Sequence, residues 1–380
     1  MRRWWFLGLF LILALLPISG LGDLLPEDFL VDEGIARWYR LEDFADEPPE
    51  QAFLVESGTC QVTISFLGDC TLGGEESTAS SANSFARVVE KNGDSWPFGG
   101  VEEFLSRSDL TMVNLEGVLS DRKLTKVKKK FNFRGKTAYA DLLRKNGVEL
   151  VTLSNNHSGD YGSQGLSDTK TALEEAGVWW IDWGTPVIWE KDGIMVGFTA
   201  SWGNMSSAQA EQLGEEMSQM REAGCQYIIH SMHLGIEYQV APSAAQRNTA
   251  LKAVQAGADL VIGHHPHVVQ GIGLVEGVPV VYSLGNAVFG GNFDPRDYDA
   301  LLLQVTLTLE EGEPQPLQLR LVPISVSSVS RKNDYRLTPL SGKDGQRVLD
   351  KMTQSTHYTL PEFQDGGVVV DAAWLSENGE

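Results

Sequence analysis

The sequence predicts an α/β protein with a largely parallel sheet, because strand-like and helix-like segments alternate along most of its 380 residues. Runs rich in β-branched and apolar residues predict strands at 61–67, 110–113, 148–153, 194–199, 226–232, 259–262 and 278–284. Apolar residues at helical spacing predict helices between them at 84–92, 137–146, 163–176, 207–223 and 243–256. Such alternation indicates βαβ units, in which a helix connects two parallel strands.

The N-terminus has the pattern of a secretory signal peptide or an N-terminal anchor over residues 1–22. Arg2 and Arg3 precede an apolar run that extends to Leu16, and small residues follow up to Gly22. If it is retained, the segment nearly reaches the roughly 20 residues that span a bilayer. Both alternatives predict a protein that is secreted or anchored at the outer face of the cytoplasmic membrane.

The rest of the chain divides into three parts. Residues 23–59 are acidic and read as a variable linker, residues 60–330 carry the main domain, and residues 331–380 read as a C-terminal extension. Within 300–324, apolar and polar residues alternate, which predicts antiparallel strands that complete a second sheet. A final helix is expected over 342–354.

The charge pattern limits the classes of molecule that the protein is expected to bind. A net charge of −21 excludes general binding to nucleic acid, whose phosphates this surface would repel. Eight basic residues nevertheless lie between Arg122 and Lys136, among them Lys128, Lys129 and Lys130. Two interpretations stay open: the cluster attracts an anionic polymer or phosphate substrate to a nearby site, or it is a solvated loop.

Imidazole side chains gather at the ends of three predicted strands. The chain has seven histidines, and three of them lie in Gly263-His264-His265-Pro266-His267. His230 and His233 end another strand, and His157 follows a third. Because open α/β sheets bind ligands at the carboxyl ends of their strands, this pattern predicts a metal site.

The His265-Pro266-His267 segment is the strongest part of this pattern. In an extended segment, side chains at i and i+2 face the same side, and Pro266 would hold φ near −65°. We therefore expect His265 and His267 to bind one metal centre. His264 is expected to be a neighbour or a substrate contact.

Oxygen ligands follow other predicted strands. Asp69 comes after Gly68, Asn114 and Glu116 end the next strand, and Asn156 follows a third. Adjacent carboxylate and amide oxygens can hold divalent cations, and mixed oxygen and imidazole ligands suit Mn, Fe or Zn better than calcium.

Two further histidine motifs predict roles beyond ligation. His157 is a candidate general acid, and Asp160 is placed to orient its ring. His233 is the preferred ligand over His230, which belongs to the strand. Glu237 is expected to orient a substrate or a ligand.

These motifs, in this order, resemble the CapA family of capsule or poly-γ-glutamate synthesis proteins, within the calcineurin-like metallophosphoesterase superfamily. The resemblance covers residues 61–290 and ends with Tyr282-Ser283-Leu284-Gly285-Asn286. It implies a four-layer α/β/β/α sandwich with two divalent ions at the sheet edge. Two departures stand out: Thr71 takes the place of a ligand histidine, and Ser158 that of an aspartate.

The resemblance also assigns roles to residues. It implies metal ligands at Asp69, Glu116, Asn114, Asn156, His233, His265 and His267, with His157 and Asp160 as catalytic residues. The expected substrate contacts are Glu237, His264, Asn286, Lys128, Lys129 and Lys130.

Three functions are compatible with this pattern. The first is a divalent-metal-dependent phosphoesterase-like hydrolase of capsule or poly-γ-glutamate biosynthesis, in which two ions activate water and polarise phosphate. The second is a non-catalytic surface factor that binds an anionic polymer such as poly-γ-glutamate for its assembly or export. The third is a metal-dependent amide hydrolase of that polymer. A membrane-bound polymer synthesis complex is an expected partner in each case.

Overall fold

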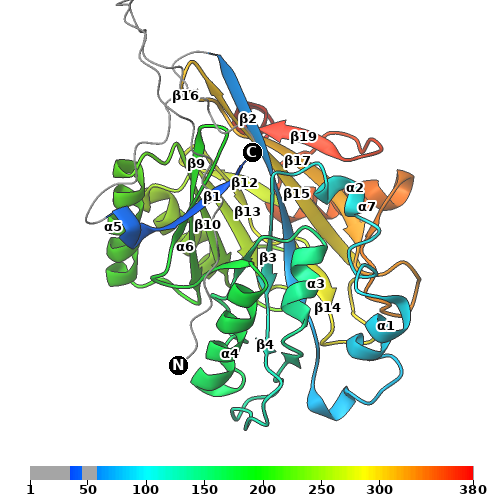
Figure 1. Ribbon diagram of the computed structural model, residues 1–380. Coiled ribbons are helices and arrows are strands. Elements are labelled where there is room, and N and C mark those ends of the chain that lie inside the picture. Colours follow the sequence, from blue (N-terminus) through cyan, green and yellow to red (C-terminus); the bar gives the residue numbers. More distant parts are fainter. Residues whose placement is uncertain (1–34, 45–57, 380) are drawn as a thin grey trace, which may run out of the picture.

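The structure is a computed structural model that describes residues 35–44 and 58–379 (Figure 1). It contains two large mixed β-sheets with eight α-helices in the described part, which confirms the α/β class. The predictions for residues 1–22 and for most of 23–59 lie outside the described residues. Among the described helices, none is long and apolar enough to cross a membrane.

A ten-stranded sheet is built around the long strand β2. On one side lie its parallel neighbours, in the order β3 (Leu110–Leu115), β6 (Leu150–Thr152) and β7 (Trp179–Ile181). On the other side β2 (Thr59–Thr71) pairs antiparallel with β15 (Asp299–Glu310), and β15 with β17 (Gln318–Ser325). The remaining strands are β14 (Asn286–Phe289), β16 (Glu313–Pro314), β18 (Thr338–Pro339) and β19 (Val368–Asp371).

A seven-stranded sheet holds the later strands. β9 (Ile194–Trp202), β10 (Tyr227–His233), β11 (Leu260–His264) and β13 (Val278–Val281) run parallel in that order. Antiparallel strands complete the two edges: β8 (Val187–Lys191) with β1 (Arg37–Arg40) on one, and β12 (Ile272–Val275) on the other.

One topological prediction was wrong. The antiparallel strands expected within 300–324 do form, as β15 and β17, but they extend the sheet of β2 rather than complete a second one. Strand β15 pairs with β2 from Leu303 to Glu310, so these strands share one hydrogen-bonded surface. Four strands of the second sheet, β9, β10, β11 and β13, were predicted for the largely parallel sheet, whereas β1, β8 and β12 were not predicted.

Six of the eight described helices form close to their predicted positions, and the short helices α2 and α8 were not predicted. They are α1 (Phe85–Asn92), α2 (Glu102–Leu105), α3 (Tyr139–Lys145), α4 (Gly162–Glu175), α5 (Ser207–Glu222), α6 (Ala244–Ala256), α7 (Gly342–Thr356) and α8 (Ala372–Asn378). Ser206 and Ser243 begin α5 and α6 with capping boxes, each accepting a hydrogen bond from the backbone N–H of a glutamine three residues later.

Three hydrophobic clusters hold these elements together. The first joins residues of both sheets, such as Ile64 of β2 and Phe198 of β9. The second cluster packs the other face of β2, β3 and β6 against α1, α3 and α4. The third packs strands β8, β9, β10 and β11 against α5 and α6. Figure 1 shows α5 and α6 beside β9 and β10, and α3 and α4 beside β3. Strands buried on both faces read as continuous apolar runs, which explains why the sequence located them so well.

The C-terminal residues pack on the same core. Val348, Leu349 and Met352 of α7 belong to the cluster between the sheets, and β19 pairs antiparallel with β17. Within the described chain, residues 338–378 therefore continue the ten-stranded sheet and its packing.

Candidate metal centre

The ends of strands from both sheets meet in one buried polar cluster. Asp69 lies near the end of β2, Asn114 in β3, and His233 at the end of β10. The Asn114 amide nitrogen donates to Asp69 Oδ1 at 2.8 Å and lies 3.1 Å from His233 Nδ1. All three side chains are buried. The two sheets thus bring together residues that are far apart in sequence.

A glycine permits part of this convergence. A Cβ atom on Gly68 would lie 2.0 Å from the carbonyl oxygen of Gly285, so only glycine fits beside that backbone. The close approach lets the Asp69 N–H donate to Gly285 O at 3.0 Å and sets Asn286 opposite Asp69 in β14.

Asp69, Glu116 and His267 form a group that could hold a metal ion. One ligand atom from each lies within 4.8 Å of the others, and all three residues are buried. His267 Nδ1 is 3.0 Å from Asp69 Oδ2, and His267 Nε2 is 3.9 Å from Glu116 Oε1. Carboxylate and imidazole ligands at such separations suit a divalent transition metal.

Glu116 provides the sharpest test of that fit. Both of its carboxylate oxygens are buried and have no hydrogen-bond partner among the described residues. Burial raises the pKa of Glu116 to about 8, and the charge of Asp69 adds to this, while His267 opposes it. A buried carboxylate without a hydrogen-bond partner costs several kcal/mol. A divalent cation would supply the missing charge, so the donor set fits a metal ion.

A second group of polar atoms surrounds His233 Nε2. Asn156 Oδ1 lies 2.7 Å from this nitrogen, His265 Nδ1 lies 3.1 Å from it, and Glu116 Oε1 lies 4.0 Å from it. Burial lowers the pKa of both His233 and His265, which favours the neutral imidazoles that ligate metals. Six of the seven predicted ligands, all but Asn114, thus fall into two groups that share Glu116.

Charge in the first group is strongly coupled. Burial on its own would raise the pKa of Asp69, but the hydrogen bond and charge of His267 outweigh it and hold that pKa well below its usual range. For His267, burial lowers the pKa, but Glu116 and Asp69 together raise it to about 9. The protonation of Asp69, Glu116 and His267 is therefore linked, because the charge of each side chain shifts the pKa of the others.

The backbone at His265 and His267 differs from the prediction. We expected an extended segment, but φ is +98° at His265 and +57° at His267, in the left-handed region. Strand β11 ends at His264, and the chain turns sharply there. The two rings still face each other at 6.0 Å between centroids. Such backbone costs about 1–3 kcal/mol per residue and is concentrated at functional sites.

His157 is held from one side by a buried carboxylate. Asp160 Oδ2 lies 2.8 Å from His157 Nδ1 and also accepts from the Phe133 N–H at 2.6 Å. The Phe133 ring stacks on the imidazole at 4.5 Å between centroids. His157 Nε2 faces inward, 3.7 Å from Glu116 Oε1. The ring orientation is thus set by Asp160, and its free nitrogen points at the centre.

Lys129 is part of this arrangement. Its ammonium group pairs with Asp160 Oδ1, donates to the Asn156 carbonyl at 2.7 Å and lies 3.1 Å from His157 Nδ1. Lys128 and Lys130 are exposed, and Lys130 lies over the ring of Phe131. The three lysines that the sequence grouped as substrate contacts therefore occupy different environments.

The structure places Asn114 beside the ligands. Its Oδ1 accepts from the Asn155 amide nitrogen at 3.0 Å, and its own amide nitrogen faces Asp69. Asn155 was missed as a site residue. It also donates to the Leu115 carbonyl at 2.9 Å and accepts from the His157 N–H. The polar pair after a fully apolar strand was the signal that could have indicated this role.

The other predicted substrate contacts lie around the centre. His264 is buried, with Nδ1 3.7 Å from Asp69 Oδ1 and no hydrogen-bond partner among the described residues. Asn286 contacts His267 through its Oδ1 at 3.0 Å from Nδ1. Glu237 is exposed at the rim, close enough to raise the pKa of His267.

His230, which we expected to pack within its strand, lies between the hydroxyls of Thr199 and Ser201, each 2.9 Å away. Burial lowers its pKa to about 3.

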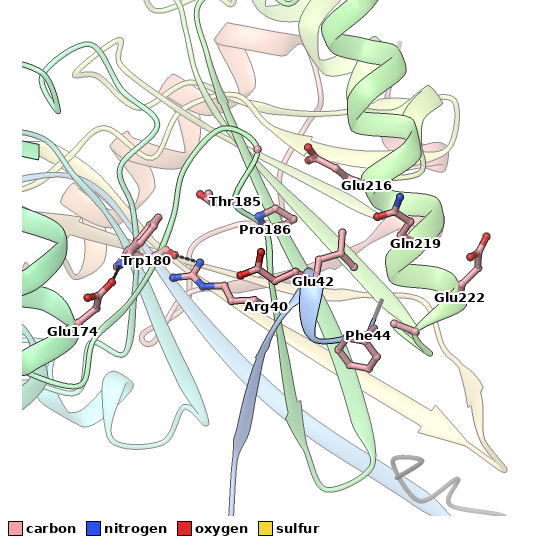
Figure 2. A pocket seen from close by; sticks show the side chains of 13 residues that line it. Arg40, Glu42, Phe44, Glu174, Trp180, Thr185, Pro186, Glu216, Gln219 and Glu222 are labelled. Carbon is pink, nitrogen blue, oxygen red and sulfur yellow. Dashed lines mark hydrogen bonds between the residues drawn. The ribbon is translucent and has the colours of Figure 1, made fainter. Parts of the chain in front are cut away.

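A separate pocket of about 940 Å³ lies elsewhere on the molecule (Figure 2). Arg40 stands in it over the Trp180 ring, 4.3 Å from the centroid, and donates to the Trp180 carbonyl at 3.0 Å. Glutamates line the surrounding wall, as Figure 2 shows for Glu42, Glu174, Glu216 and Glu222. None of the candidate metal ligands lines this pocket.

Fold and site together define an α/β protein with a buried carboxylate and imidazole centre able to hold a metal ion. Residues 63–291 match the family described as "Bacterial capsule synthesis protein PGA_cap". The chain therefore belongs to this CapA family of capsule and polyglutamate biosynthesis, within the metallophosphoesterase-like superfamily.

Relatives with curated names agree with this assignment. The chain is 27% identical to "Capsule biosynthesis protein CapA" of Bacillus anthracis, over 68% of this chain and 70% of that protein. It is 28% identical to "PGA biosynthesis protein CapA" of Bacillus subtilis, over 65% and 68% respectively. A "Probable polyglutamine synthesis accessory protein" of Mycobacterium tuberculosis is 24% identical, over 61% and 70%.

Proposed function

We propose that this protein is an exported, divalent-metal-dependent hydrolase of the phosphoesterase type that acts in capsule or polyglutamate biosynthesis. The observation that carries the proposal is the Glu116 carboxylate, which is buried without a hydrogen-bond partner between two groups of candidate ligands. Such a group is costly in a merely structural role, and a cation would satisfy it.

The candidate ligands would hold two ions. One would bind Asp69, Glu116 and His267, and the other Glu116, Asn156, His233 and His265. When bound, divalent ions polarise a phosphoryl or carbonyl oxygen and lower the pKa of water. Their identity is proposed as Mn, Fe or Zn from the mixture of oxygen and nitrogen ligands.

His157 would act as the general acid. Asp160 engages Nδ1 and stabilises the imidazolium, so that Nε2, which faces Glu116, delivers its proton to the leaving group. The Phe133 ring covers one face of the imidazole and limits its rotation. Lys129 neutralises the buried Asp160 carboxylate and ties it to the loop after Asn155.

Metal content and hydrolysis test the proposal together. We expect stoichiometric divalent metal by elemental analysis and hydrolysis of bis(4-nitrophenyl) phosphate, both reduced by Glu116→Gln and by Asp69→Asn. Glu211→Gln, on the exposed side of α5, is the matched control. Metal-free wild-type protein of full stability, or unchanged hydrolysis in Glu116→Gln, would count against a metal enzyme.

The names of the relatives favour one alternative substrate. Because their names refer to PGA biosynthesis and to polyglutamine synthesis, the same centre is also a candidate for hydrolysis of γ-glutamyl amides. Release of 4-nitroaniline from a γ-glutamyl anilide, lost in Glu116→Gln, would support this reaction. Binding of poly-γ-glutamate without hydrolysis, dependent on Lys128 and Lys130, would instead support a surface factor in the polymer synthesis complex.

Two structural proposals accompany this function. The three hydrophobic clusters support a four-layer order of helices, ten-stranded sheet, seven-stranded sheet and helices. The apolar segment within residues 1–22 supports export or anchoring at the outer face of the membrane. Detection of the protein only in the cytoplasmic fraction would contradict export.

A further inference from the structure

A pocket of about 310 Å³ adjoins the candidate metal centre. Its lining residues include Asn156 and Asp160 of the centre, together with Val127, Leu166, Asp182 and Trp202. Its volume lies at the lower end of the range for small-molecule sites, about 300–1,000 Å³. The hydrolytic arrangement described above makes no use of Trp202 or Asp182.

We propose that this pocket binds a neutral sugar residue of a cell-envelope glycan, beside the reacting group. The inference rests on the proposed function in one respect: the bound glycan would be part of the substrate of the proposed hydrolase. It extends that function by naming a class of substrate other than the anionic polymer.

Trp202 supplies a flat apolar wall. It ends β9 directly opposite His233 in register, so its position is fixed by the same sheet as the candidate ligand. The residue is 54% exposed, and its indole nitrogen has no hydrogen bond within the described chain. Val127, 38% exposed, lines the same pocket. Large exposed rings at a pocket offer binding area at little cost in conformational entropy.

Polar groups at the pocket suit hydroxyls. The Asn156 oxygen is engaged by His233, while its amide nitrogen has no partner in the described part of the chain and can donate. Asp182 has a carboxylate that is 22% exposed and can accept from a ligand O–H. A few such groups around an aromatic wall are the usual composition of a small-molecule site.

Charge argues against a polyanion here. Lys129 is the only cation among the lining residues, and it is paired with Asp160. The Asp182 carboxylate is balanced by Lys170 at 3.3 Å. A carboxylate polymer would find no unpaired cation in the pocket and would meet a chain of net charge −21.

Titration with two oligomers tests the inference. Chitotetraose and a γ-glutamyl tetramer are added to the purified protein, and binding is followed by calorimetry and tryptophan fluorescence. We expect chitotetraose to bind, Trp202→Ala to weaken it about tenfold or more, and Trp202→Phe to retain most of the affinity. Ile236→Ala is the control, since Ile236 is 56% exposed but does not line the pocket.

The outcomes separate this inference from the proposed function. No binding of chitotetraose at millimolar concentration, or binding of the γ-glutamyl tetramer that depends on Trp202, would overturn the sugar site. Binding is measured again after chelation. Chitotetraose binding that survives chelation shows that the sugar site does not need the metal. If purified, untreated wild-type protein binds chitotetraose but contains no metal and hydrolyses neither test substrate, the metal enzyme is refuted and the sugar site stands.

Discussion

Replacement of Lys129 by methionine tests whether the basic loop is a structural clamp or a polymer-binding surface. In the structure, the Lys129 ammonium group contacts Asp160, the Asn156 carbonyl and His157. Methionine keeps the apolar stem and removes the charge. Among the described residues, the fully buried Asp160 carboxylate would then keep His157 as its only ion-pair partner.

The expected cost follows from burial. A hydrogen bond to a charged group contributes about 1.5–3 kcal/mol. Since the Lys129 side chain is 28% exposed, water screens part of this interaction. We expect Lys129→Met to lower the free energy of unfolding by about 1–3 kcal/mol, as measured by urea denaturation.

Lys128→Met and Lys130→Met are the matched controls. Both residues are exposed, so each change is expected to stay within about 0.5 kcal/mol. If all three variants have the same stability and lose polymer binding equally, the clamp is refuted and the loop acts as one basic surface. If Lys129→Met alone loses stability, the ion pair between Lys129 and Asp160 anchors the basic loop to the candidate metal centre.

Three other predictions concern the centre itself. In chelator-treated protein, burial raises the pKa of Glu116 to about 8. The stability that the protonated Glu116 side chain contributes is therefore present at low pH and is lost as the pH rises through 8. Glu116→Gln should flatten this pH dependence in thermal melts at several pH values, and an unchanged profile would contradict the assignment. Phe133→Leu removes the ring that stacks on His157 and should lower the free energy of unfolding by about 1 kcal/mol. Turnover should fall while the metal content stays unchanged. Loss of metal would show that Phe133 supports the ligands instead. Asn114→Asp places a second carboxylate where the Asn114 amide now donates to Asp69 at 2.8 Å. Because two carboxylates repel each other, the chelated variant should melt at a lower temperature than the wild type and should regain stability with divalent metal. If stability is not regained, no cation binds there.

The residues of the centre were largely predictable, whereas their arrangement was not. Histidines and carboxylates at strand ends identified Asp69, Glu116 and His267, because polar groups after apolar strands are costly unless used. Local pattern did not reveal that Asn114 turns its amide nitrogen toward Asp69, since that depends on Asn155 from the loop that follows β6.

The environment of Lys129 and the backbone conformation of His265 and His267 could not be predicted from the local sequence, for the same reason. Spacing placed Lys129 among solvent-facing neighbours, but its partner Asp160 is brought to it by the fold. An extended path was the natural expectation around Pro266, yet φ is positive at His265 and His267, whose rings contact His233 and Asn286 across the centre. Long-range contacts outweigh local preference there.

The strands, helices and candidate ligands followed from periodicity and residue chemistry, because burial imposes its pattern on each segment separately. The division of the strands between two sheets, the pairing of β15 with β2 and the sharing of Glu116 by two ligand groups came from the assembled fold. The reason is physical: hydrogen bonding between strands and the meeting of side chains depend on which segments become neighbours in space, and a linear pattern of apolar residues is the same for several such arrangements.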